Sequence, residues 1–525
     1  MLTIPAIPIQ VPLIQFVNED DQILLNSPEA EWFRILNDLP WQNYRDIAAG
    51  YYNALYDFNN NSCKVEKSTN ESIESEEEAK LRLLSDRATV NEETPVLYEP
   101  EFMTPAAQTV KPISLAPGIV PFRSDGRKPK CFFGLFMSFI GASLMNFPSE
   151  PDAVHSLLTS NLSFARVCGF VPKGGDDQYW RKHVPSRRKL EQFDQIMRDY
   201  GLWHQAKIDV IKRNITDQVI REENIVVGDT THYEAHSEFE VVTFDGENGK
   251  EKKKSQSKIT KNCCCVDRAI CPHPWILVDD GAGTIHKSKI KIVWGHKASV
   301  IGLPSQGIPL DAVAVSDAAT NDGRTFFPHV EKLFDNYPEI QPWFGIALYD
   351  AACCNKELKK DFIENFNIVL KTPLNPRKIA SVTNRLPRAM DKLTPFGTLT
   401  CKGGCQMDYK GMRNGAETYI YQSPIDENSG ELVCVDCKHK SECCPNSDKG
   451  RTVTISFDLL PHIDPQDPIM AKRFKTTMKK RTSVERMIKR LKCDLGDSRL
   501  RKRGNASFQA YLDKTMIAFH ILLRN

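Results

Sequence analysis

The sequence predicts an α/β protein built on a mixed sheet that helices flank, preceded by a helical region and interrupted by a cysteine-rich insertion. Two observations lead to this fold class. Short apolar runs, typical of strands, come first as a group of three and then alternate with helical patterns, which favours a mixed sheet over an all-parallel one. Two pairs of closely spaced cysteines then follow in a long stretch near the C-terminus. A length of 525 residues is also enough for several domains.

The first part of the chain divides into three segments. Residues 1–56 are expected to form a small helical unit, and residues 57–125 an acidic linker rich in Ser and Asn. Residues 126–222 are expected to be helical, either as an ordinary bundle or as a helix-turn-helix-like DNA-binding unit. One candidate helix spans residues 186–203, with Ser186 placed as its N-cap. The apolar face of this helix consists of Leu190, Phe193, Met197 and Tyr200.

No segment of the sequence resembles a membrane span or a signal peptide. The longest uncharged apolar run, residues 132–147, is shorter than the roughly 20 residues that a membrane helix needs. The N-terminus lacks the basic region of a signal peptide. We therefore expect a cytoplasmic, nucleoid-associated protein without a membrane partner, whose 16 cysteines are reduced or bind metal. Net charge is only +2, but residues 471–504 hold fourteen Lys and Arg against three acidic residues.

From residue 223 the pattern becomes β-β-β-α-β-α-β, and segments 223–375 and 476–525 are assigned to one core. The first and fourth strands each end in an aspartate, Asp229 and Asp350. We expect these strands to be neighbours, so that the two carboxylates favour a shared divalent cation. The alternative is that each aspartate only begins a turn. Strands are expected at 224–229, 289–302, 309–322, 343–350 and 367–373, with helices at 329–337 and 356–366.

The segment KKRTSVERMIKRLK (479–492) contains seven Lys or Arg among fourteen residues and a single acid, Glu485. Helical spacing places Arg481, Glu485 and Lys492 on one face. We interpret Glu485 as a third carboxylate that completes a metal site while the cations hold phosphates. The alternative is a surface helix with salt bridges four residues apart. An apolar stripe that could dock the helix on the sheet consists of Val484, Met487, Ile488 and Leu491.

Over roughly residues 130–525, the chain resembles DDE-type transposases of bacterial insertion sequences. In that group the third acidic residue lies in a helix as Arg-x3-Glu-x6-Lys, which Arg481, Glu485 and Lys492 match. Met478 stands where the wider pattern often has a Tyr.

Further segments carry the same resemblance. Asp229 lies in GDTTHYEA, and Asp350 lies in LYDAACCNKEL. The segments WGHK, with Lys297, and AATND, which ends in Asn321 and Asp322, are also similar to parts of these transposases. The resemblance does not extend to the first 125 residues.

The resemblance implies an RNase H-like core in which Asp229, Asp350 and Glu485 hold two Mg²⁺ or Mn²⁺ ions. It implies hydrolysis at the ends of a mobile element and transfer of the freed 3′-OH into target DNA. The implied partners are terminal inverted repeats, target DNA and at least one further copy of the chain. A nuclease that hydrolyses without joining and an inactive, domesticated DNA-binding protein are the alternatives. The expected DNA contacts are Arg481, Lys489, Arg490, Lys492 and Lys297.

The insertion, residues 376–475, contains cysteines at the spacing of zinc knuckles. Tetrahedral Zn²⁺ takes four thiolates, which two short-spaced pairs commonly supply. The candidate ligands of this zinc-ribbon-like site are Cys401, Cys405, Cys434 and Cys437, with Cys443 or Cys444 able to replace one. Reduced cysteines without metal are the alternative. A second cluster, NCCCVDRAICPH (262–273), is expected to be structural or incidental. The lysine run at 250–258 is expected to form a solvated hairpin tip, or else to contact phosphate.

Overall fold

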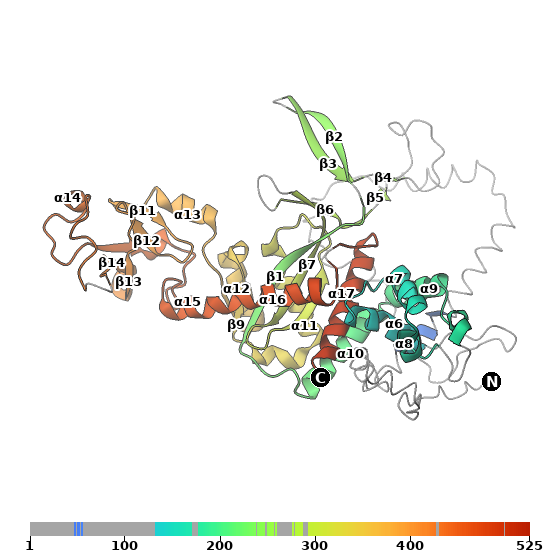
Figure 1. Ribbon diagram of the computed structural model, residues 1–525. Coiled ribbons are helices and arrows are strands. Elements are labelled where there is room, and N and C mark those ends of the chain that lie inside the picture. The colour runs from blue at the N-terminus through green and yellow to red at the C-terminus, as the bar shows by residue number, and fades with distance from the viewer. Residues whose placement is uncertain are drawn as a thin grey trace, which may run out of the picture.

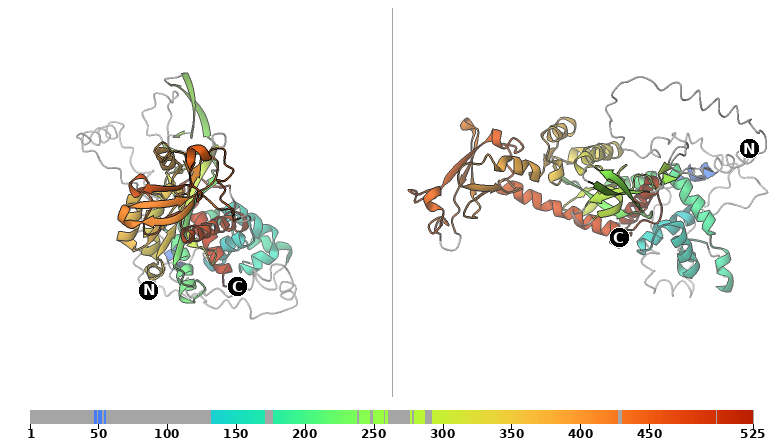
Figure 2. Two further views of the ribbon diagram at one scale, coloured as in Figure 1. Left: turned by 90° about the vertical axis from the view of Figure 1, so that its left-hand side faces the viewer. Right: turned by 90° about the horizontal axis from the view of Figure 1, so that it is seen from above.

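In the computed structural model, a β-sheet covered by helices lies at the centre, with a helical region at one end and the insertion at the other (Figures 1 and 2). The predicted linker (57–125) and the cysteine cluster at 262–273 lie outside the described residues. The structure describes residues 47–48, 50–52, 54–55, 132–170, 177–237, 239–246, 249–256, 258–259, 276–277, 279–286, 292–426, 430–497 and 499–524.

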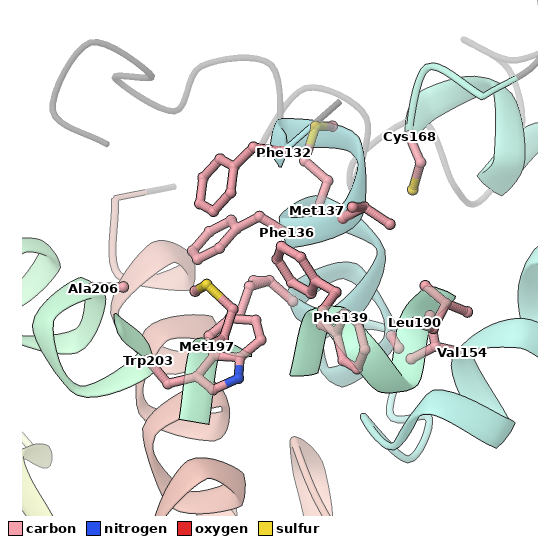
Figure 3. Packing of buried hydrophobic residues seen from close by; sticks show 14 of the residues in the cluster. Phe132, Phe136, Met137, Phe139, Val154, Cys168, Leu190, Met197, Trp203 and Ala206 are labelled. Carbon is pink, nitrogen blue, oxygen red and sulfur yellow. The ribbon is translucent and has the colours of Figure 1, made fainter. Parts of the chain in front are cut away.

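The apolar run near residue 132 forms the central helix of the helical region. This helix, α6 (Phe132–Leu144), is buried along nearly its whole length. The rings of Phe136 and Phe139 lie 5.4 and 5.7 Å from that of Trp203 (Figure 3). None of the helices among the described residues is long and apolar enough to cross a membrane. The surrounding elements are α7 (Pro151–Ser160), α8 (Leu162–Val167), η2 (Asp177–Lys182), α9 (Arg187–Asp199) and α10 (Leu202–Thr216).

Residues 186–203 were predicted to form one helix. They instead contain α9 and the first residues of α10, which continues to Thr216. Gly201 separates them with a φ of +66°, which a glycine adopts without the steric cost of a side chain. The predicted apolar face is buried at Leu190, Phe193 and Met197. Ser186 occupies the N-cap position of α9, but its side chain makes no capping hydrogen bond.

The central sheet is mixed, as the sequence predicts. Its strands follow the order β10-β9-β1-β7-β6, and β8 also pairs with β7. Pairings of β7 with β1, β6 and β8 are antiparallel, whereas β1–β9 and β9–β10 are parallel. The strands are β1 (Ile225–Glu234), β6 (Gly283–His286), β7 (Ile292–Leu303), β8 (Ile308–Ala314), β9 (Ile346–Leu348) and β10 (Val369–Lys371).

Helices cover both faces of this sheet. Consecutive residues of β1 belong to different cores: Val226 packs in the cluster that contains helix α11 (Phe326–Asn336), and Val227 in the cluster that contains Val484 and Met487. Alternation along a strand places neighbours on opposite faces. Helix α12 (Lys356–Phe366) has the predicted bounds, and α17 (Asn505–Leu522) packs on α10 and β8.

Several elements differ from their predicted bounds. The third strand ends at Ala314 rather than at 322, and the AATND segment lies in the following turns. Strand β6 follows no clear sequence pattern. The lysine run lies along β3 (Gly249–Gln256), one arm of a projecting hairpin with β2 (Phe239–Gly246), rather than at its tip (Figure 1).

The insertion is a separate lobe that a long helical segment joins to the sheet (Figures 1 and 2). This segment consists of α15 (Lys472–Met478), η8 (Lys479–Thr482), α16 (Ser483–Lys489) and η9 (Arg490–Asp494). The lobe contains α13 (Pro376–Thr383), the pair β11 (Met390–Leu393) and β12 (Leu399–Cys401), the sheet β13 (Asp408–Arg413), β14 (Thr418–Gln422) and β15 (Thr452–Ser456), and α14 (Lys440–Cys443).

Candidate functional site

The register of two parallel strands brings Asp229 and Asp350 together. Val227 of β1 pairs with Leu348 of β9, and each aspartate lies two residues further along its strand direction. The predicted placement of these strands side by side is therefore confirmed. The first strand was predicted to end at Asp229, but β1 continues to Glu234 because β7 pairs with it there. Asp229 thus lies in the part of β1 that still pairs with β7 on one side but extends beyond β9 on the other.

The two aspartates are partly buried, and backbone N–H groups orient them. The Oδ1 atom of Asp229 accepts a hydrogen bond from the N–H of Thr230 at 2.8 Å. Asp350 caps the following turn by accepting from the N–H of Ala352 at 2.8 Å. The pKa of Asp229 is raised to about 6, chiefly by burial; the negative charges of Asp350 and Asp322 add to this rise, and Arg481 opposes it. Burial likewise raises the pKa of Asp350.

Helix α16 carries Glu485 to the same edge of the sheet. Val484 and Met487 are fully buried and dock the helix, as the apolar stripe predicts. Gly302 on β7 permits this close approach, because a Cβ there would lie 2.5 Å from both Met487 Sδ and Ile308 O. The packing leaves Glu485 on the accessible side, with its side chain 62% exposed.

Arg481 joins two of the three predicted carboxylates. Its Nη1 atom lies 3.2 Å from Asp229 Oδ2, and its Nη2 atom lies 3.6 Å from Glu485 Oε1. One guanidinium thus supplies positive charge to both side chains. The ion pair with Glu485, four residues apart, is also the contact that the structural alternative requires.

Asp322 is a fourth carboxylate at this edge, to which the sequence analysis gave no role. It begins the turn η3 (Asp322–Arg324), and its Oδ1 accepts a hydrogen bond from Lys297 Nζ at 2.9 Å. The turn that it begins packs against the turn after Asp350, since a Cβ on Gly323 would lie 2.6 Å from Ala352 O, and its charge raises the pKa of both Asp229 and Asp350. The sequence feature that could have identified Asp322 is its place at the end of AATND, a segment that is similar to part of the transposases.

The predicted DNA contacts divide into exposed and buried groups. Lys489 and Arg490 are exposed, with the Arg490 guanidinium 4.4 Å from the ring centroid of Phe519. Lys492 lies against β1, where its ammonium donates to His232 O and sits over the ring of Tyr233. Lys297 is only 5% exposed and donates to Thr320 O as well as to Asp322.

Carboxylates of the kind that Mg²⁺ prefers gather at this edge. As the side chains lie, however, the described part of the chain contains no group of three or more His, Cys, Asp or Glu arranged to hold a metal ion. Glu485 extends to Arg481 rather than directly to the aspartates.

The thiols of the insertion also gather, around a cavity of about 20 Å³. Its lining includes His439 and the thiols of Cys401, Cys434, Cys437, Cys443 and Cys444. Burial raises the pKa of Cys405, and the neighbouring Cys401, Cys434 and Cys437 add to this. The two predicted pairs therefore lie near each other and their donor type suits Zn²⁺, although as the described side chains lie, no three thiols are arranged to hold a metal ion.

No protein-family model matches the sequence, and no curated protein matches it significantly. Among solved structures, the chain is similar to the piggyBac transposase synaptic complex with hairpin DNA, at 10% identity and a TM-score of 0.32, over 75% of this chain and 65% of that one. It is also similar to the Mos1 transposase paired-end complex with the left transposon end, at 13% identity and a TM-score of 0.15, over 48% and 62%. The chain thus spans just under two thirds of these neighbours.

Proposed function

We propose that the chain is a DDE-type DNA transposase that hydrolyses phosphodiester bonds at element ends and transfers the freed strand into target DNA. One observation carries the proposal. Asp229, Asp350 and the Glu485 helix, 121 and 135 residues apart in sequence, meet at one edge of the sheet. The motif Arg-x3-Glu-x6-Lys then has its Arg481 in contact with the first aspartate.

The electrostatics of the site support a divalent cation as cofactor. Partial burial raises the pKa of both Asp229 and Asp350, and the charge of Asp350 adds to the rise at Asp229, so two charged carboxylates without a cation are disfavoured. Asp229, Asp350 and Glu485 would hold Mg²⁺ or Mn²⁺. When bound, such ions activate the attacking oxygen and stabilise the leaving one. Arg481 orients Asp229 and Glu485 and offers charge to a phosphate.

The strand order supports an RNase H-like core. The strand β1, which carries the first aspartate, pairs with the antiparallel β7 on one side and with the parallel β9 on the other, so helices and a mixed sheet surround the first aspartate as such a core requires. The exposed Lys489 and Arg490 beside Glu485 are suited to the DNA backbone. A homodimer or larger assembly follows from the chemistry, because two element ends must be joined.

We further propose that Cys401, Cys405, Cys434 and Cys437 bind one structural Zn²⁺, with Cys443 able to replace one of them. Cys401, Cys434 and Cys437 line one cavity, and their charges act on the pKa of Cys405, which supports this site.

The test of function is a cleavage and joining reaction on DNA that carries the sequences flanking the gene, with Mg²⁺. We expect cleavage that exposes 3′-OH ends, followed by joined products. Asp350→Asn should abolish both, whereas Asp361→Asn, an exposed aspartate on α12, should abolish neither. Cleavage without joining would favour the nuclease alternative, and absence of metal-dependent cleavage would contradict the proposal.

A further inference from the structure

Three basic side chains from three different elements meet beside the turn that follows Asp350. Lys359 comes from α12, Lys378 from α13, and His462 from the loop that leads from β15 towards α15. The Lys378 ammonium lies 3.2 Å from His462 Nδ1 and 2.5 Å from the carbonyl oxygen of Cys354. Lys359 Nζ donates to His462 O at 3.3 Å. All three are half-buried and reach solvent.

The two lysines of this cluster lack the carboxylate ion pairs that neighbouring cations have. Lys371 and Arg473 share Asp467, at 2.5 and 3.0 Å. In the part of the chain that the structure describes, Lys359 and Lys378 form no ion pair with a carboxylate. Their polar contacts are neutral groups, namely carbonyl oxygens and the imidazole of His462.

Both ammonium groups contact the same residue, His462, so two positive charges lie near each other in a partly buried place, where they repel. Burial lowers the pKa of Lys359 and the charge of Lys378 adds to this, while Cys354, Asp464 and Asp467 oppose it. Burial and then Lys378, Lys359 and Lys356 lower the pKa of His462. A bound anion would relieve this repulsion.

The cluster also adjoins the candidate site. Asp350 caps the turn Ala351–Cys353, and Lys378 binds the next carbonyl, that of Cys354. Asn375, at the N-cap of α13, donates to Ala351 O at 3.2 Å. The insertion, which provides Lys378 and His462, is therefore fastened to the turn that carries the second aspartate.

We propose that Lys359, Lys378 and His462 form a subsite for a backbone phosphate of the DNA strand that passes the Asp350 edge of the site. This inference rests on the proposed function and adds a role for the insertion, which supplies two of the three groups. A phosphodiester suits the subsite because it offers charged oxygens to donors that approach from separate elements. The DNA strand would then contact this subsite on one side and the exposed Lys489 and Arg490 at the end of α16 on the other.

The test is binding of a fluorescent 40-base-pair duplex to the full chain without divalent metal, measured across a salt series. The variant Lys359→Gln with Lys378→Gln should bind about tenfold more weakly at low salt, with a salt slope reduced by about one to two, because each lost phosphate contact removes counterion release. Lys360→Gln is the matched control, since this lysine of the same helix is exposed and pairs with Glu364 at 3.3 Å. Lys378→Arg keeps the charge and should retain binding.

The outcomes separate the two proposals. An unchanged affinity and slope in the folded double variant would overturn the subsite and leave the proposed function standing. If the double variant does not fold, Lys378→Gln alone replaces it, with an expected slope change of about one. A wild-type chain that does not bind the duplex would overturn both proposals.

Discussion

Asp229 and Asp350 lie two residues beyond the same paired position of the sheet, where Val227 of β1 faces Leu348 of β9. Parallel strands in equal register carry such residues to one edge, so the closeness of the two carboxylates follows from backbone hydrogen bonding. The same edge receives Arg481 from a helix 252 residues further along the chain. This relationship has consequences for stability, metal binding and DNA contact.

The raised pKa of Asp229 predicts a pH-dependent cost to stability. Because the folded pKa is about 6 and the ordinary value is 3.8, the folded state keeps a proton that the unfolded chain loses as pH rises between these values. Stability contributed by this group therefore falls over that window. Without divalent metal, Asp229→Asn should raise the free energy of unfolding at pH 7 by up to about 3 kcal/mol. Urea unfolding at pH 7 and pH 4 measures this, and an equal effect at both values would contradict it.

Gly302 is expected to control how closely the Glu485 helix docks. Gly302→Ala would force a Cβ against Met487 Sδ and Ile308 O, so it should lower the free energy of unfolding by about 1–3 kcal/mol. Gly415→Ala is the control, because nothing lies within 4 Å of the Cβ it would add. Thermal unfolding of the two variants compares them. Equal stability would show that α16 does not depend on this close approach.

The basic face of α16 and η9 should contribute to DNA binding through counterion release. Neutralising Lys489, Arg490 and Lys492 together should weaken duplex binding and flatten its salt dependence by about one per lost contact. Lys489 is expected to contribute the most, because Arg490 lies over Phe519 and Lys492 donates to His232 O. Binding titrations over a salt series measure this. A slope equal to that of the wild type would remove this face from the interface.

Purified protein should contain about one zinc ion per chain, since two thiol pairs make one tetrahedral site. Replacing Cys434 and Cys437 with Ser should remove the zinc and destabilise the insertion more than the sheet. Cys493→Ser is the control, because this free cysteine is exposed and lies outside the thiol cluster. Elemental analysis of protein purified without chelators measures the zinc content. Wild-type protein that contains no zinc would contradict the proposed zinc site.

The sequence predicts the backbone of this site better than its full set of side chains. Apolar runs that end in aspartate predict that β1 and β9 are neighbours, and the stripe through Val484 and Met487 predicts how α16 docks. The loop that carries Asp322 has no periodic pattern, so only the fold brings it near Asp229. The break at Gly201 was missed because helical periodicity continues on both sides of it.

The cationic cluster beside Cys354 has no local signal either. Lys359, Lys378 and His462 are far apart in sequence, and each alone resembles an ordinary surface residue. Their proximity depends on how the insertion packs against α12. Sequence patterns describe single elements, whereas a site between elements depends on tertiary packing.

The role of Glu485 is the central claim, because the structure also allows a plain salt bridge with Arg481. Glu485→Gln keeps the size of the side chain and removes its charge. Glu364→Gln is the matched control, since Glu364 is an exposed helical residue paired with Lys360 four positions away. Loss of such an exposed pair costs no more than about 0.5 kcal/mol.

The most direct measurement is Mg²⁺-dependent cleavage of DNA containing the element's ends by Glu485→Gln, with DNA binding measured in parallel. We expect binding to survive or strengthen, while cleavage falls by several orders of magnitude, because positioned metal ions supply several kcal/mol of transition-state stabilisation. Glu364→Gln should cleave normally. Near-normal cleavage by Glu485→Gln would contradict the account, because it would leave Glu485 with only the salt-bridge role.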